Sequence, residues 1–300
     1  MAEVYLKSDF SIKKISKYIL LSLIPLILGG FYKNGISLYL NDFVGIVGMF
    51  KPLIITGLGF LIGVLVNLIF EYIIKNRKDT FTNTVFSSFH PVFGILIASV
   101  ISINTNIMIF SIITFAILLF SKFFRSIRIN IMALIALIII LIGSVFADVS
   151  FLNAYEASTT LHLGPLNYLL GMGSGGINTT YIIFLAISFA ILAHQDFYKK
   201  SIPLFGIIAY CISITVYSLI TNNLDSLMSN IFGFGILFSF VYLAPDSMSS
   251  SYTNKGQVVF GIILGVITFG LFLVYPPLAA LGAIFLTSMM NVTIDKFCLR

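Results

Sequence analysis

Long apolar runs separated by short polar connections dominate the chain and predict an all-α protein. Ten runs approach the length of about 20 mostly apolar residues that a helix needs to cross a bilayer. We expect these transmembrane helices at residues 18–40, 50–74, 85–103, 107–121, 129–147, 179–193, 202–220, 231–243, 257–275 and 278–292. Several runs are short, so one or two of them could re-enter the membrane instead of crossing it.

The composition predicts a polytopic membrane protein. Hydrophobic residues make up 59% of the 300 residues, charged residues make up 9%, and the mean hydropathy is +1.07. A soluble domain contains roughly 25% charged residues, so this chain could not cover its surface with water-compatible side chains. The expected surroundings are therefore membrane lipid. The net charge of +6 indicates basic cytoplasmic loops and gives no support to nucleic-acid binding.

Basic residues sort to one side of the predicted helices. Of the 17 Lys and Arg residues, all but Lys33 and Lys51 fall in connections or termini on the same side. Cytoplasmic loops carry an excess of Lys and Arg, so we predict ten crossings with both termini in the cytoplasm. The first apolar run follows a polar segment and has no small-residue cleavage site, so we expect it to be retained.

Five runs precede and five follow one long polar interval. The chain therefore divides into an N-terminal membrane half at residues 1–147, an external loop at 148–178 and a C-terminal membrane half at 179–300. Two five-helix halves enter the membrane with opposite orientation, which is the setting for an inverted repeat. We find no convincing residue-level similarity between the halves, so the prediction of two inverted five-helix repeats rests on geometry.

Small residues inside the runs predict close helix packing. Gly59 and Gly63 lie four residues apart in the second run, and Gly261 and Gly265 do so in the ninth. Residues at this spacing lie on one helix face, and glycine there lets two backbones approach. We therefore expect both pairs to form packing faces.

Ionisable residues are almost absent from the predicted spans. Glu71 is the nearest case, and it lies about one turn from Lys75 at the inner end of its run, where it can pair or reach the interface. The sequence thus predicts no carboxylate relay in mid-membrane. If the chain conducts an ion or solute, then hydroxyls, amides such as Asn67 and carbonyls of broken helices must line the path.

The external loop, residues 148–178, is the first place to look for chemistry. It contains no Lys or Arg, and it carries a hydroxyl cluster at residues 158–160 and a glycine-rich run. Gly171, Gly173 and Gly176 match the dinucleotide fingerprint as text, but that fingerprint works only between a strand and a helix of a soluble βαβ unit. A weaker hypothesis is that Gly173 and Gly176 present backbone N–H groups to a phosphate. An ordinary flexible connection is the alternative.

The histidines and cysteines predict no metal site. His90 and His194 map to the cytoplasmic side and His162 to the outer side, while Cys211 and Cys298 lie far apart in the sequence. A structural zinc or an iron–sulfur cluster would need about four clustered ligands. No nucleophile–base pair accompanies the histidines, so the sequence predicts no catalytic residue of a hydrolase.

Three segments of the C-terminal half carry a family resemblance. Asp246…Ser249…Thr253-Asn254-Lys255-Gly256, followed by Val258–Phe260 and Gly261, resembles a D-P-V-[ST]…T-N-[RK]-G…F-G signature. Tyr275-Pro276 leading to Asn291 and Asp295 is similar to a Y-P…N…P-L-I-D ending, and Lys199–Leu204 to a W-[RH]-I-P-L segment. These motifs are typical of the RnfD/NqrB family. RnfD is a membrane protein of the Rnf ion-translocating electron-transport complex, and NqrB is its relative in the Na⁺-translocating NADH:quinone reductase.

The N-terminal half resembles the family more weakly. Glu71 with Lys75–Lys78 falls where the family has an E…[KR]-[KR] span end. Lys122 and Asn130 fall near its K-x-x-[FY]-G-G-x-G-x-N-x-F-N-P-A segment, but residues 123–126 replace the glycines. The resemblance implies a fold of ten spans in two inverted five-helix halves, similar to urea-transporter-like bundles.

The resemblance also implies a flavin site. In the family, an outer loop carries an [S]-x-A-T-[PA]-L motif whose Thr holds FMN through a phosphoester bond. Residues 156–161 are similar to it, which places Thr159 on the attachment position, with Thr160 as the adjacent alternative. Ser158 stands where the family has Ala.

The function implied by the resemblance is that of an integral membrane subunit of an Rnf/Nqr-type redox-driven ion pump in the cytoplasmic (inner) membrane of a bacterium. Such a chain would be one part of a translocase-type oxidoreductase, not a stand-alone catalyst, and electrons would pass through FMN on the outer side while Na⁺ or H⁺ moves. The implied partners are other membrane subunits, a flavin-bearing outer subunit and cytoplasmic iron–sulfur subunits. Two alternatives stay open: a solute channel or transporter with a urea-transporter-like fold, and a flavin-free structural subunit of the complex.

Overall fold

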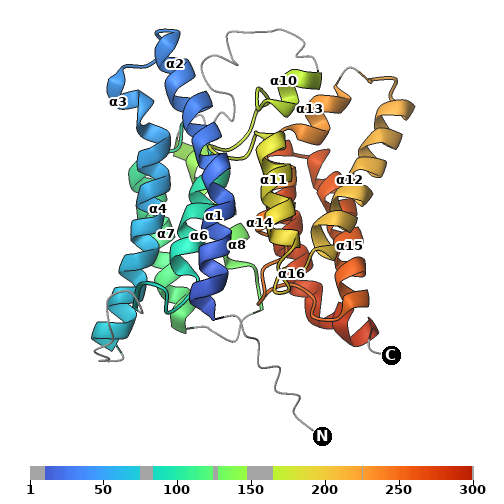
Figure 1. The fold of residues 1–300 in the computed structure, drawn as a ribbon. Helices are drawn as coiled ribbons and strands as arrows, with labels where there is room; N and C mark the ends of the chain where they lie inside the picture. Colours follow the sequence, from blue (N-terminus) through green and yellow to red (C-terminus); the bar gives the residue numbers. More distant parts are fainter. Residues whose placement is uncertain (1–10, 75–83, 124–127, 147–164, 225, 299–300) are drawn as a thin grey trace, which may run out of the picture.

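The structure, a computed structural model, describes residues 11–74, 84–123, 128–146, 165–224 and 226–298. Every regular element in these ranges is a helix (Figure 1). The N-terminal half contains α1 (Ile12–Phe31), the π-helix η1 (Tyr32–Ile36), α2 (Ser37–Leu40), α3 (Ile46–Met49), α4 (Lys51–Leu68), the π-helix η2 (Ile69–Ile74), α6 (His90–Val100), α7 (Ile107–Phe123) and α8 (Ile131–Phe146). The short α10 (Pro165–Leu169) precedes the C-terminal half, which contains α11 (Ile182–Ala193), α12 (Ser201–Ile220), α13 (Leu227–Phe232), α14 (Ile236–Tyr242), α15 (Asn254–Phe272), the 3₁₀-helix η3 (Pro276–Leu278) and α16 (Ala279–Cys298).

Every predicted apolar run contains a helix, and the all-α polytopic class is confirmed. Within the described residues, five helical segments are long and apolar enough to cross a membrane: Ile12–Leu40, Lys51–Ile73, Ser201–Ile220, Asn254–Phe272 and Pro276–Cys298. The remaining runs form shorter apolar helices: His90–Val100, Ile107–Phe123, Ile131–Ser144, Ile182–Ala193 and Leu227–Tyr242. Ten complete crossings therefore stay a prediction, and the short helices indicate that part of the bundle is built from broken segments.

Two long helices begin earlier than the apolar pattern predicts. α1 starts at Ile12, where the side chain of Ser11 accepts a hydrogen bond from the backbone N–H of Lys14. α15 starts at Asn254, where the Thr253 hydroxyl accepts from the backbone N–H of Gly256. In both cases a capped polar turn extends the helix beyond its apolar stretch, because capping satisfies backbone donors that hydropathy does not register.

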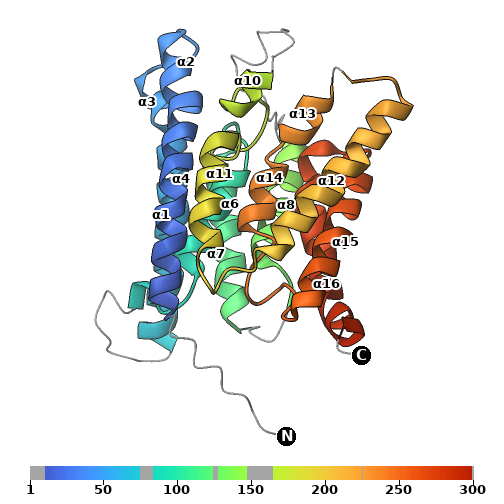
Figure 2. The same cartoon turned by 45° about the vertical axis from the view of Figure 1, so that its right-hand side comes forward.

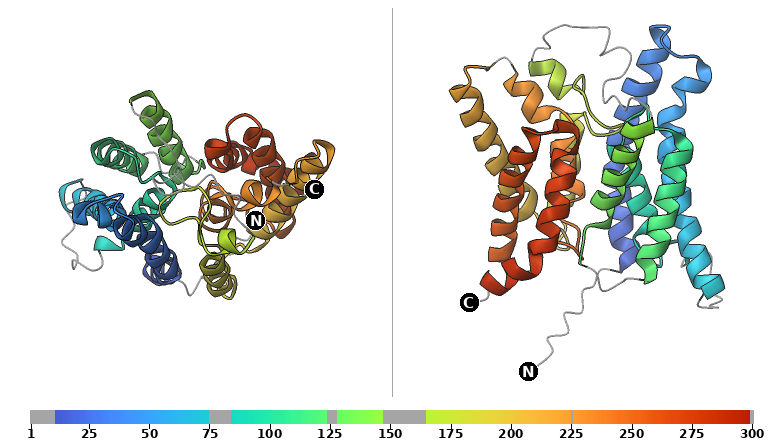
Figure 3. Two further views of the ribbon diagram at one scale, coloured as in Figure 1. Left: turned by 90° about the horizontal axis from the view of Figure 1, so that it is seen from above. Right: turned by 180° about the vertical axis from the view of Figure 1, so that it is seen from behind.

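The two halves lie side by side. Seen from above, the blue-to-green helices gather on one side and the orange-to-red helices on the other (Figure 3). α1 packs against α11, and α8 packs against α16 (Figure 2). α1 rises from the end of the bundle where α16 ends, whereas α11 descends toward that end (Figure 1). The first helices of the two halves thus meet in opposite directions and the fifth helices also meet, which is the contact pattern of an inverted repeat.

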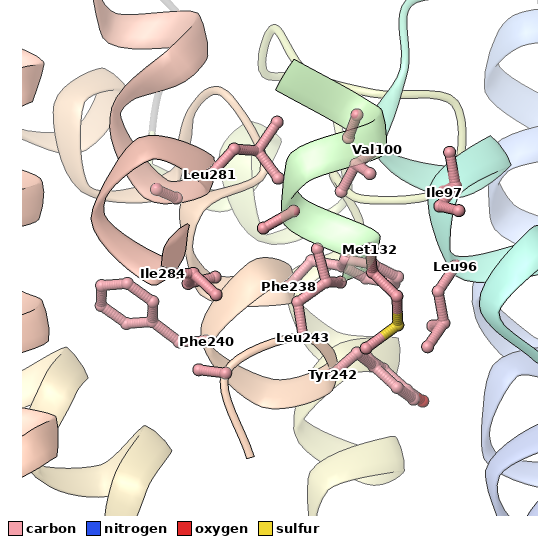
Figure 4. Close-up of a cluster of buried hydrophobic side chains, with 14 of the residues drawn as sticks. Leu96, Ile97, Val100, Met132, Phe238, Phe240, Tyr242, Leu243, Leu281 and Ile284 are labelled. Carbon is pink, nitrogen blue, oxygen red and sulfur yellow. The ribbon is translucent and has the colours of Figure 1, made fainter. Parts of the chain in front are cut away.

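A single apolar core joins the halves. Side chains from α6, α8, α14 and α16 point toward one another in its centre (Figure 4). Its members include Leu96, Ile97 and Val100 of α6, Met132 of α8, Phe238 and Phe240 of α14, and Leu281 and Ile284 of α16. Since the short helices α6 and α14 supply much of this core, they are held in place by both halves.

The predicted glycine faces are confirmed. A Cβ added to Gly59 or Gly63 would lie 2.3 Å from a backbone oxygen of α6. A Cβ added to Gly261 or Gly265 would lie 2.8 and 2.5 Å, respectively, from backbone oxygens of α12. Glycine therefore sets the close approach of α4 to α6 and of α15 to α12.

Candidate functional site

The segment between α10 and α11 crosses the molecule without helical structure. We call residues 173–180 the distal crossover, because they lie away from the end where α1 begins and α16 ends, which we call the terminal end (Figure 1). The chain turns at Gly171, whose φ of +89° lies in the left-handed region that favours glycine. The backbone N–H groups of Ile177 and Asn178 then donate to the carbonyls of Ile101 and Ser99, at 3.0 and 3.2 Å. The distal crossover is thus fastened to the C-terminal end of α6.

A buried lysine holds the distal crossover from the α1 side. Lys33 lies in η1 and is only 7% exposed. Its Nζ donates to the carbonyl of Gly173 and, at 3.4 Å, to Oγ1 of Thr180. Its neighbour Asn34 donates from Nδ2 to the carbonyl of Ile177 at 2.9 Å. π-helical turns are frequent at functional sites, and here the turn directs two consecutive polar side chains to one segment.

Asn178 sits at the centre of the distal crossover and is 1% exposed. Its Nδ2 donates to Oγ1 of Thr56 at 3.2 Å and to Oγ of Ser99 at 3.1 Å. Its Oδ1 has no hydrogen-bond partner within the described residues. This oxygen lies against Gly30 of α1, where an added Cβ would come within 2.1 Å of it.

Hydroxyl groups continue this polar line between α1 and the second half. Ser188 of α11 donates to the carbonyl of Ser22 at 2.6 Å, and the phenol of Tyr242 donates to Oγ of Ser22 at 2.9 Å. Ser22 precedes Gly30 on α1, so these groups lie nearer the terminal end than Asn178 does. We call this boundary between α1 and the C-terminal half the seam. It carries the hydroxyls, amides and unwound backbone expected of a polar path.

At the terminal end, the connection between α14 and α15 forms a second polar region, the terminal junction (residues 243–253 with the side chains that hold them). Asn130, just before α8, donates from Nδ2 to the carbonyl of Leu243 at 2.7 Å and to Oγ of Ser249 at 3.1 Å. Its Oδ1 accepts from the backbone N–H of Ala133 at 3.0 Å, which caps α8. Asn291 of α16 donates to the carbonyl of Ser249 at 2.7 Å. Side chains of both halves therefore close the junction.

Two carboxylates complete the terminal junction. Asp246 accepts from the backbone N–H and the hydroxyl of Ser249, at 3.1 and 2.7 Å. Asp295 accepts from the hydroxyl of Ser251, from Oγ1 of Thr253 at 3.2 Å and from the backbone N–H of Tyr252 at 3.2 Å. The separate motifs of the C-terminal half thus meet in one cluster, with hydroxyl and amide donors around each carboxylate.

Lys199 provides the cation of the terminal junction. Its Nζ donates to Oγ of Ser250 at 2.8 Å and lies 4.5 Å from the centre of the Tyr252 ring. Burial lowers the pKa of Lys199 to about 8, against the opposing effect of the Asp246 and Asp295 carboxylates. Burial likewise raises the pKa of Asp246 above its ordinary value, while the hydrogen bonds from Ser249 and the charge of Lys199 act in the other direction. Desolvation therefore favours the neutral form of both partners.

A cavity of about 420 Å³ opens beside the terminal junction. Its polar lining consists of Glu71, Ser87, Ser88, His90, Ser121, Lys122 and Asp246. Ser88 lies 2.6 Å from Oδ1 of Asn67 and 2.5 Å from Nδ1 of His90, whose Nε2 lies 3.0 Å from Oγ of Ser121. The Ser88 hydroxyl donates to Oδ1 of Asn67 and the Ser121 hydroxyl donates to the carbonyl of Leu118 at 2.7 Å, so the imidazole can donate to either serine, depending on its tautomer. Asn67, expected to line a polar path, thus lies next to the cavity wall.

The structure describes only some of the predicted site residues. Thr159 and Thr160 lie outside the described residues, as does His162. Gly173 and Gly176 lie in the distal crossover: the carbonyl of Gly173 accepts from Lys33, and a Cβ added to Gly176 would lie 2.6 Å from the carbonyl oxygens of Ser99 and Val100. α11 begins only at Ile182, so neither glycine opens its first turn, and their contact with a phosphate stays a prediction.

The distal crossover contains functional candidates that the sequence analysis missed. The sequence analysis counted Lys33 only as one of two basic residues on the opposite side of the predicted helices, and the structure shows that it is buried. Its helical segment, Ile12–Leu40, has 29 residues, more than the roughly 20 that a straight span requires. This extra length was the first available signal that a lysine near the end of the segment could be covered by another part of the chain. The polar triplet 178–180 directly before an apolar run was the second available signal.

Comparison with known proteins assigns the chain to a family. The NQR2, RnfD, RnfE family matches residues 1–300, including the N-terminal half in which the motifs are weak. No individual curated protein matches the chain. The match covers the full sequence, and the helical fold with its membrane-length apolar segments agrees with it. The chain therefore belongs to the NQR2, RnfD, RnfE family and is a multi-pass membrane subunit of an Rnf/Nqr-type complex.

Proposed function

We propose that this chain takes part in electron transfer through an FMN attached to Thr159, in a complex that couples electron flow to movement of Na⁺ or H⁺. The observation that carries the proposal is the family match over residues 1–300. The similarity of residues 156–161 to the flavin-bearing motif of the family selects the attachment residue. When bound, FMN supplies the redox chemistry, and the protein sets its position and potential.

The chain's own contribution is the hydroxyl of Thr159 and the anchored distal crossover that follows it in the sequence. The oxygen of Thr159 would form the ester bond to the FMN phosphate, with Thr160 as the adjacent alternative. The distal crossover, which follows this stretch in the sequence, is fastened by Lys33, Asn34 and the end of α6. The backbone N–H groups of Gly173 and Gly176 are the proposed contacts for the phosphate.

We place the distal end on the outer side of a bacterial inner membrane, with both termini in the cytoplasm. Basic residues support this orientation, because cytoplasmic ends carry the excess of Lys and Arg. In the described part of the chain, the first turns of α1 hold Lys13 and Lys14, and the last turn of α16 holds Lys296. Lys51 begins α4 at the opposite end.

The proposed partners follow from the chemistry of electron transfer. An electron must reach a flavin on this chain and leave it again, so neighbouring subunits must carry redox groups. We propose other membrane subunits, an outer flavin-bearing subunit and cytoplasmic iron–sulfur subunits. The chain is accordingly one part of a translocase-type oxidoreductase.

Flavin fluorescence after denaturing electrophoresis tests the proposal. The chain, purified with its whole complex, is expected to give a fluorescent band that survives denaturation, because an ester bond is covalent. Thr159→Ala should abolish the band, whereas Thr160→Ala should keep it. A complex that contains the chain but shows no fluorescent band would overturn the FMN assignment.

A solute channel or transporter without redox chemistry is the second candidate. The cavity of about 420 Å³ and the polar seam between the halves favour it. The same gel distinguishes the two, because a channel needs no flavin. A flavin-free chain that conducts a solute when reconstituted alone would establish the channel, and a flavin-free chain that conducts nothing would indicate a structural subunit.

A further inference from the structure

The distal crossover offers oxygen atoms to the face of α1 that meets it. The described acceptors are the carbonyl of Gly173, Oγ1 of Thr180 and Oδ1 of Asn178. Carbonyl, hydroxyl and amide oxygens are the ligand types that hard cations prefer. Unwound backbone next to a broken helix is also where membrane transporters coordinate Na⁺. These acceptor oxygens therefore give the surface that faces α1 and η1 the chemistry of a cation site.

The cation that occupies this surface is part of the chain. The ammonium of Lys33 contacts Gly173 and Thr180 from a position that is 7% exposed. Gly30 lies three residues earlier on α1, so it shares the helix face of Lys33. Because Gly30 has no side chain, Oδ1 of Asn178 can lie against the helix at this point. Lys33 and Oδ1 of Asn178 thus lie on the same face of the helix that α1 and η1 form together.

A buried charge is costly unless oxygen ligands replace its hydration. For Lys33 the carbonyl of Gly173 and the hydroxyl of Thr180 serve this purpose. If the ammonium is removed, the same oxygens are left facing the seam, and a small dehydrated cation can satisfy them. Na⁺ fits this role because its interactions with oxygen ligands are similar in kind to those of an ammonium group.

We propose that Lys33 is a tethered cation that fills a monovalent-cation site at the distal end of the seam and thereby closes this route to free Na⁺. The proposal rests on the proposed function, since it concerns a complex that moves Na⁺ or H⁺. Lys33, which lies outside the flavin motif at residues 156–161, thereby has a function of its own. In the intact chain, ions must then either take another route while Lys33 stays in place or pass here only when Lys33 moves aside.

The test uses the whole complex reconstituted into liposomes without an electron donor. Passive uptake of radioactive Na⁺ is measured for the unchanged complex and for complexes with Lys33→Ala, Lys33→Gln or Lys33→Arg. We expect a several-fold rise in uptake for Lys33→Ala and Lys33→Gln, because both lack the charge. Lys33→Arg keeps a cation and should stay as tight as the unchanged complex. Lys51→Ala, at the same end of the bundle, is the matched control and should also stay tight.

Thermal unfolding in NaCl and in choline chloride provides a second measurement on the same complexes. Na⁺ should stabilise the Lys33→Ala and Lys33→Gln complexes relative to choline, which is too large to occupy the site, and should leave the Lys51→Ala complex unchanged. Assembled neutral variants that neither leak nor respond to Na⁺ would overturn the proposal. Failure of both neutral variants to assemble would overturn it as well, since Lys33 would then be a structural residue. Neither measurement requires FMN, so the flavin gel and this test can fail independently.

Discussion

The two polar ends of the seam have opposite charge chemistry. At the terminal junction, Asp246 and Asp295 are surrounded by hydroxyl and amide donors. At the distal crossover, the ammonium of Lys33 is surrounded by carbonyl and hydroxyl acceptors. The terminal end therefore combines two carboxyl groups with the amine of Lys199, whereas the distal end holds an ammonium among neutral oxygen acceptors. The comparison indicates that both ends of the seam are polar but differ in the charged groups that they contain.

The two ends also differ in what holds them together. The terminal junction is closed by side chains that reach from both halves, above all Asn130 and Asn291. The distal crossover is held in part by direct contact between backbones, at Gly176 and the last turn of α6. We therefore expect side-chain truncation to damage the terminal end most, and added side-chain volume to damage the distal end most.

The largest effect is expected for Asn130→Leu at the terminal junction. The substitution leaves the carbonyl of Leu243 with only a long hydrogen bond of 3.4 Å from the backbone N–H of Asp246, and it removes the cap of α8. Together these losses should lower the free energy of unfolding by about 2–4 kcal/mol. Equilibrium unfolding in mixed detergent micelles, followed by circular dichroism, measures this change.

Asn106→Ala is the matched control for Asn130→Leu. Asn106 accepts from the backbone N–H of Met108 at 2.8 Å and caps α7 in the same way, but it is exposed. Its loss should cost only about 1 kcal/mol. Equal losses for the two variants would show that Asn130 acts as a helix cap alone and does not join the halves.

A pH-dependent effect is expected for Lys199→Met. The variant removes the hydrogen bond from Lys199 to Ser250 at 2.8 Å, a loss of about 1–3 kcal/mol where the amine is neutral. Burial lowers the pKa of Lys199 to about 8, so folding disfavours the charged form of this side chain. Below a pH of about 8 the unchanged protein therefore carries a desolvation cost that the variant lacks. The loss of stability in Lys199→Met should thus be greatest above a pH of about 8 and shrink as the pH falls below it.

The measurement for Lys199→Met is the apparent melting temperature across this pH range. Lys200→Met serves as the control, because Lys200 is adjacent in sequence but exposed. A constant difference between Lys199→Met and the unchanged protein at every pH would contradict the lowered pKa of Lys199.

A loss similar in size to the largest one for Lys199→Met is expected for Gly176→Ala in the distal crossover. Its new Cβ would lie 2.6 Å from the carbonyl oxygens of Ser99 and Val100, and these backbone atoms can yield only if the crossover shifts. We expect a loss of about 1–3 kcal/mol in the free energy of unfolding, measured as for Asn130→Leu. Gly57→Ala on α4 meets no atom within 4 Å and should be neutral or slightly stabilising. A neutral Gly176→Ala would show that backbone contact does not hold the distal end.

Much of the fold was predictable from local patterns. The apolar runs predicted a helix in every interval, and the spacing of Gly59 and Gly63 predicted the face on which α4 meets α6. The sequence analysis identified Asp246 and Asp295 in two separate motifs, but it did not predict which hydroxyl groups each carboxylate would meet. Such partners come from turns whose geometry depends on neighbouring helices, and hydropathy carries no information about them.

The sequence by itself determined the all-helical membrane class, the helix order and the family, because apolar length, helical spacing and motif order are properties of nearby residues. Only the tertiary structure decided that Lys33 is buried and that it meets Gly173, which lies 140 residues away. It likewise decided that Asn130 reaches Leu243 across the boundary between the halves, 113 residues along the chain. Hydrogen bonds of this kind depend on how two distant segments cross, and that geometry is fixed by the packing of the whole bundle.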